Sequence, residues 1–168
     1  MKLLLLAAAL WAAAAAWEPA VKPPKGWSAR PGDGGATVLS GPQAELPLAP
    51  LISIRRYPKD GPEFKDAAAY LKAQAEPGIV KIKGQKPAQA GRVKAGKREL
   101  ERVTRFASEF IPPASMNAVE VPLREEHVVV PARDAFVVLV YAAPEKGFER
   151  NRKVFQRVLE SVAAREGR

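Results

Sequence analysis

The stretch Phe136-Val-Val-Leu-Val-Tyr141 decides how the rest of this sequence can fold. It consists of β-branched, aromatic and aliphatic side chains without a polar interruption, as expected of a β-strand. A strand that is apolar on both faces belongs at the centre of a sheet that is covered on each side. The two faces are Phe136, Val138 and Val140 on one side and Val137, Leu139 and Tyr141 on the other.

Two segments have the spacing of amphipathic helices and can supply that cover. In the first, Pro62 suits the first helical position and Pro77-Gly78 ends the pattern. The second runs from about Lys146 to Ala164. Their apolar stripes are Phe64, Ala67, Ala68, Leu71 and Ala75 in the first helix, and Phe148, Phe155, Leu159 and Val162 in the second.

The remaining periodic segments alternate as strands do, and we expect strands over residues 36–40, 51–57, 79–83, 92–97 and 123–130. Residues 98–110 fit either a helix or a strand, and their Val, Thr and Phe content favours a strand. Residues 111–122, with Pro112-Pro113, are predicted to be a long connection. The order predicts an α+β fold: an α/β/α sandwich whose mainly antiparallel sheet carries a helix on each face.

The first sixteen residues have the three parts of a secretory signal peptide. Lys2 is followed by an apolar run from Leu3 to Ala16, which ends in an Ala-x-Ala cleavage site. The sequence therefore predicts a signal peptide over 1–16, one domain over 17–168, and an exported protein that is periplasmic or secreted. The alternatives are an uncleaved anchor or a buried helix. Richness in Ala, Arg and Pro indicates a GC-rich bacterial genome.

The scarcity of reactive side chains argues against an enzyme. The chain has no Cys and one His, which excludes disulfides, thiolate ligands and multi-histidine metal sites. On the predicted strand His127 shares a face with Glu125, so a general base is one interpretation and a structural histidine the other. The run from Gly91 to Arg98 nearly matches a phosphate-binding loop but ends in Arg where a hydroxyl is needed. We therefore expect no cofactor, no metal and no catalytic residue.

The positive charge is concentrated in one part of the sequence. Residues 81–105 carry nine basic and two acidic side chains in a chain of formal net charge +9. Such a concentration can attract an anionic partner, whereas a solvated hairpin with a protected edge is the plainer interpretation. Export argues against nucleic acid as that partner. The predicted anion- or partner-binding residues are Lys81, Lys83, Lys86, Arg92, Lys94, Lys97 and Arg98.

Three phrases of the sequence resemble the PsbP/Mog1-like superfamily of single-domain proteins. They are Pro23-Pro24-Lys25-Gly26-Trp27, Phe64-Lys-Asp-Ala-Ala-Ala-Tyr70-Leu71, and Phe136 to Pro144 followed by Phe148 to Val162. The resemblance implies an antiparallel sheet between helices and a non-enzymatic role in docking on larger assemblies or binding other proteins. It implies no particular site residue.

The leading hypothesis is therefore an exported, non-catalytic interaction or assembly module of the cell envelope. It would contact an anionic envelope protein or surface through the basic stretch 81–98, and no transmembrane segment would remain after signal cleavage. A small-molecule or lipid carrier is the first alternative. An envelope hydrolase that uses His127 is the second.

Overall fold

A computed structural model describes residues 21–44, 46–77 and 86–167 of the chain. The predicted signal peptide and the strand expected over 79–83 lie outside these residues. The described elements are seven strands, two helices and two short 3₁₀ turns. They are β1 (Ser28–Pro31), η1 (Asp33–Gly35), β2 (Thr37–Ser40), β3 (Leu51–Pro58), α1 (Ala67–Ala75), β4 (Gln89–Ala95), β5 (Arg98–Ile111), β6 (Val119–Pro131), β7 (Ala135–Pro144), η2 (Glu145–Gly147) and α2 (Phe148–Glu166).

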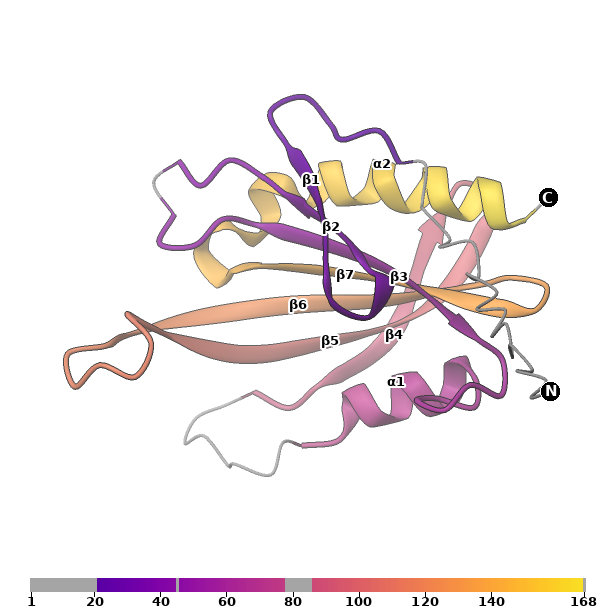
Figure 1. The fold of residues 1–168 in the computed structure, drawn as a ribbon, viewed down its shortest axis with the longest axis horizontal. Helices are drawn as coiled ribbons and strands as arrows, with labels where there is room; N and C mark the ends of the chain where they lie inside the picture. The colour runs from indigo at the N-terminus through magenta and orange to yellow at the C-terminus, as the bar shows by residue number, and fades with distance from the viewer. Residues whose placement is uncertain (1–20, 45, 78–85, 168) are drawn as a thin grey trace, which may run out of the picture.

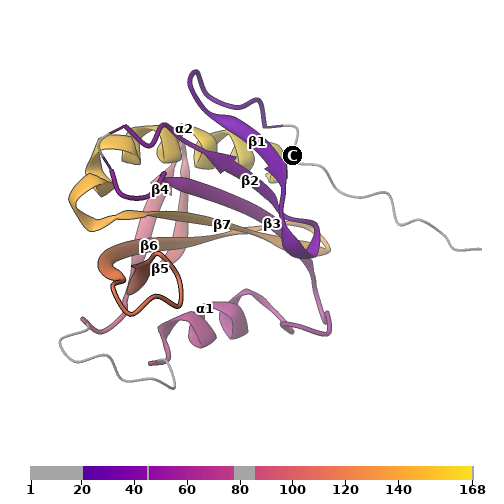
Figure 2. The same ribbon diagram turned by 60° about the vertical axis from the view of Figure 1, so that its left-hand side comes forward.

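Within the described residues the strands form one antiparallel sheet of seven, in the order β1-β2-β3-β7-β6-β5-β4. The two helices pack on opposite faces of it, α2 on one side and α1 on the other (Figures 1 and 2). The α+β class predicted from the sequence is confirmed.

Strand β7 lies at the centre of the sheet, as its two apolar faces predict. Val137, Leu139 and Tyr141 belong to the core under α2. Phe136 and Val138 belong to a smaller core under α1. Because successive side chains of β7 point to opposite faces of the sheet, this one strand contributes to both hydrophobic cores.

Helix α2 buries the stripe that the sequence marked. Phe148, Phe155, Leu159 and Val162 are all buried. The ring of Tyr141 stacks on Phe155 with centroids 5.3 Å apart, and its hydroxyl donates a 2.6 Å hydrogen bond to the Phe148 carbonyl. Helix α2 therefore packs directly on β7, the central strand that precedes it in the chain.

Helix α1 begins later than the sequence predicted. The start at Pro62 is wrong, because Asp66 is the N-cap: its side chain accepts a 2.8 Å hydrogen bond from the Ala69 N–H. Phe64 precedes the helix and packs edge-on against Tyr70, with centroids 5.0 Å apart. The helix starts here because the Asp66 carboxylate accepts a hydrogen bond from a first-turn N–H group that has no partner within the helix. Proline has no acceptor side chain and cannot satisfy such a group.

The long connection predicted over 111–122 is also wrong, because β6 already begins at Val119 and only residues 112–118 join it to β5. The strand predicted over 98–110 is confirmed as part of β5. Pro122 misled the prediction. It lies beyond the last β6–β7 pair, Leu123 with Pro144, where β6 has a neighbour on one side only and a missing N–H is tolerated.

A buried carboxylate ties the α2 face together. The Glu126 side chain is 1% exposed and contacts Arg102 Nη1 at 3.2 Å and Arg152 Nε at 3.3 Å. Since the three residues come from β6, β5 and α2, this cluster joins two strands to the helix that covers them.

Candidate binding groove

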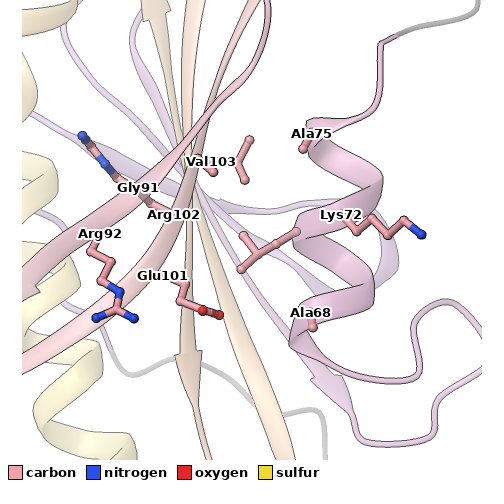
Figure 3. Close-up of a pocket in the computed structure, with 10 residues that line it drawn as sticks. Ala68, Lys72, Ala75, Gly91, Arg92, Glu101, Arg102 and Val103 are labelled. Carbon is pink, nitrogen blue, oxygen red and sulfur yellow. The ribbon is translucent and has the colours of Figure 1, made fainter.

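An open groove of about 540 Å³ lies between α1 and the β4–β5 hairpin. Its walls are mostly apolar, and we call it the α1 groove (Figure 3). From α1 it is lined by Ala68, Leu71, Lys72 and Ala75; from β4 by Ala90, Gly91 and Arg92; and from β5 by Glu101, Arg102 and Val103.

The groove exists because α1 is short and presents small residues toward β4. Tyr70 and Leu71 anchor the helix over the inner strands by joining the core with Val103 and Val129. The neighbouring face of the helix carries Ala68 and Ala75, one methyl group each, so the space toward β4 stays unfilled.

The sheet wall carries charges of both signs. Arg92 of β4 lies opposite Glu101 of β5 in the register and forms a 3.0 Å ion pair with Glu99. Lys94, two residues further along β4, shares the face of Arg92. Lys72 points from the helix away from the sheet (Figure 3). Among the described residues neither Lys72 nor Lys94 has a carboxylate within 4.0 Å, so both ammonium groups are available at the groove's margin.

The structure separates the seven predicted basic residues. Lys81 and Lys83 lie outside the described residues. Lys86 pairs with Glu145 at 2.6 Å, and Lys97 is exposed in the β4–β5 turn. Arg98 turns into the fold and donates to the carbonyls of Ala163 and Pro131 at 2.9 and 3.1 Å. Arg92 and Lys94 are the two that lie together beside the groove.

A polar cluster lies beneath α1, and His127 is its centre. The Tyr70 hydroxyl contacts His127 Nδ1 at 2.8 Å, and His127 Nε2 contacts Glu125 at 3.3 Å. The tautomer protonated on Nε2 satisfies both contacts, with Nδ1 accepting from the hydroxyl. The predicted shared face of Glu125 and His127 is therefore confirmed.

Titration in this cluster follows its contacts. The hydrogen bond from His127 lowers the pKa of Glu125, burial acts in the opposite direction, and the charges of His127 and Arg105 lower it further. Burial raises the pKa of Tyr70, so its hydroxyl stays protonated in neutral solution. Arg105 also donates to Gln74 of α1 at 2.7 Å.

This geometry favours the structural interpretation of His127 over the catalytic one. Both ring nitrogens are engaged, so neither is directed at a substrate. No group of three potential metal-binding side chains occurs among the described residues. The phosphate-loop-like run forms β4 and its turn into an antiparallel strand, instead of a loop that opens a helix.

Sequence reasoning missed the groove itself. Ala68, Leu71 and Ala75 were expected to form the core-facing stripe of α1. Only Leu71 is buried, whereas both alanines are exposed. The signal that could have indicated a groove was the run of alanines on a short helix, which cannot fill the distance to a sheet.

Comparison with known proteins leaves the family open. No family model and no curated protein matches the sequence. A crystal structure of a protein from Bacteroides thetaiotaomicron VPI-5482 is similar, with a TM-score of 0.48 and 11% identity over 84% of this chain and 42% of that one. The chain thus spans less than half the length of that protein. No helix in the described part of the chain is long and apolar enough to cross a membrane.

Proposed function

We propose that this chain is an exported, non-catalytic interaction module of the cell envelope that holds a segment of a partner protein in the α1 groove. The groove carries the proposal: its walls are apolar at Leu71, Ala75 and Val103, and Lys72 and Lys94 offer positive charge beside them. An extended partner segment with apolar side chains and a carboxylate matches that chemistry.

Export and membership of the PsbP/Mog1-like superfamily are parts of the same proposal. The signal-type sequence over 1–16 supports export. The antiparallel sheet between two helices agrees with the fold that the resemblance implies. A docking role without catalysis fits a histidine whose two nitrogens are both occupied.

Affinity capture from envelope extract, with the tagged chain as bait, tests the proposal. Ala75→Trp fills the groove, whereas Ala73→Trp changes an exposed position of α1 that does not line it. We expect one stoichiometric partner that binds at low salt and is released at high salt. This partner should bind the Ala73→Trp variant but not the Ala75→Trp variant. Binding of this partner should also weaken in a variant with five substitutions to Gln, at Lys81, Lys83, Arg92, Lys94 and Lys97. A partner that still binds the Ala75→Trp variant would show that the groove is not the site.

A small-molecule carrier is the second candidate, because the groove's volume of about 540 Å³ lies within the usual range for ligand sites, about 300–1,000 Å³. Native mass spectrometry of gently purified protein distinguishes the two. A carrier would show an adduct that disappears in Ala75→Trp. The mass of the bare chain in both proteins would exclude it.

A further inference from the structure

The large hydrophobic side chains that are exposed in the described part of the chain all lie on one hairpin. They are Phe110 at 50%, Met116 at 104% and Val119 at 67% exposure. They surround the connection between β5 and β6, and we call residues 110–119 the hairpin tip. Figure 1 shows this hairpin reaching beyond both helices, on the side away from the C-terminus. Exposed apolar groups that gather at one projecting point mark an interaction site.

The hairpin tip can leave water at little electrostatic cost. Its ten residues contain no charged side chain, in a chain where 27% of residues are charged. Glu109 and Glu120 are the first charges on either side of it. Since burying an unpaired charge is far more expensive than burying an apolar group, the boundary of the buried surface falls between these two glutamates and the tip.

The tip is apolar on both faces of the hairpin. Ile111 pairs with Val119, and Phe110 pairs with Glu120 in the next position of the register. Successive residues of a strand point to opposite faces, so Phe110 and Val119 project in opposite directions. A groove on a protein surface covers one face of an inserted hairpin, whereas a lipid interface surrounds both.

We propose that the hairpin tip inserts into the interfacial region of a lipid bilayer. Strand β5 continues two residues beyond Glu109, which is about 7 Å at the usual rise of a strand, and the loop of residues 112–118 lies beyond its end. That depth reaches the boundary between headgroups and acyl chains, with Glu109 and Glu120 at headgroup level. Because these flanking charges are negative, zwitterionic lipid suffices and anionic lipid is not required. This inference is independent of the partner bound in the α1 groove.

A single fluorescent label tests the insertion directly. The chain has no cysteine, so Met116→Cys offers one site for an environment-sensitive dye in the full chain, and the label reports the tip even if residues 1–16 also contact lipid. Arg133→Cys, exposed in the β6–β7 turn at the other end of β6, is the matched control. The probes are vesicles of pure phosphatidylcholine and of phosphatidylcholine with phosphatidylglycerol.

We expect the Met116→Cys label to shift to blue and brighten several-fold on both kinds of vesicle, and the Arg133→Cys label to stay unchanged. Phe110→Ser combined with Val119→Ser should raise the lipid concentration at half-saturation at least ten-fold. The variant's urea unfolding midpoint should match the parent, which separates lost insertion from lost folding. No response of the Met116→Cys label on either vesicle would overturn the proposal. A response that appears without lipid as the protein concentration rises would also overturn it, because the tip would then be covered by a second copy.

Discussion

Replacing Glu126 by glutamine removes the buried charge that joins β5, β6 and α2. Its carboxylate contacts Arg102 and Arg152, and the buried Nε of Arg102 has no hydrogen-bond partner among the described residues. Glu126→Gln preserves the volume of the side chain but leaves two guanidinium groups facing a neutral amide. The effect is therefore electrostatic, and it falls on the helix that covers the larger core.

The structure sets the size of this effect. Removing one partner of a buried ion pair costs about 3–5 kcal/mol. The arginine side chains are 26% and 37% exposed, so water screens part of their charge and we expect the low end, about 3 kcal/mol. For a domain of this size, that loss lowers the Tm by about 6–12 °C.

Urea unfolding at neutral pH is the assay. The control is Glu101→Gln, an exposed carboxylate of β5 for which we expect a change below about 0.5 kcal/mol. If Glu126→Gln lowers the free energy of unfolding by less than about 1 kcal/mol, the cluster does not hold α2 to the sheet and the reasoning fails.

Three further substitutions test other parts of the structure. Because the native pKa of Glu125 is lowered, its stabilisation is complete above the ordinary glutamate pKa of about 4.3 and disappears as the pH falls through the lower native value. Glu125→Gln should therefore flatten the acid limb of an unfolding-against-pH curve, and an unchanged limb would contradict this. Tyr70→Phe leaves His127 Nδ1 without its donor and should cost about 1–3 kcal/mol by urea unfolding; a neutral result would mean that water replaces the hydroxyl. In Gly41→Ala, the new Cβ would lie 2.7 Å from the Trp27 ring, so we expect a loss of about 1–3 kcal/mol by thermal unfolding, and unchanged stability would show that the ring can move.

Local periodicity predicted most of the fold. The two-faced pattern of 136–141 located the central strand, and the stripe on α2 located the larger core, because both signals come from residues that are close in sequence. The helix start and the length of the β5–β6 hairpin were not predictable in the same way. The first depended on Asp66, which caps the helix four residues after Pro62. The second depended on the sheet register, in which β7 ends opposite Leu123 and leaves Pro122 without a β7 partner.

The site was predicted less well, because sites arise from long-range packing. Sequence spacing placed Glu125 and His127 on one face correctly. It could not show that Tyr70, 57 positions earlier in the chain, occupies the other ring nitrogen. Nor could it show that Arg98 is used within the fold, whereas Arg92 and Lys94 face outward beside a groove. Charge density along a sequence does not specify how a hairpin distributes its side chains.

The most direct test of the account is site-specific photocrosslinking from helix α1 in envelope extract. A photocrosslinking amino acid is placed at Ala75, which lines the groove, or at Ala73, which is exposed on the same helix outside it. If the α1 groove holds a partner segment, position 75 gives one discrete crosslinked product at low salt and position 73 gives none. Equal products from both positions, or none from position 75, would contradict the proposed binding site.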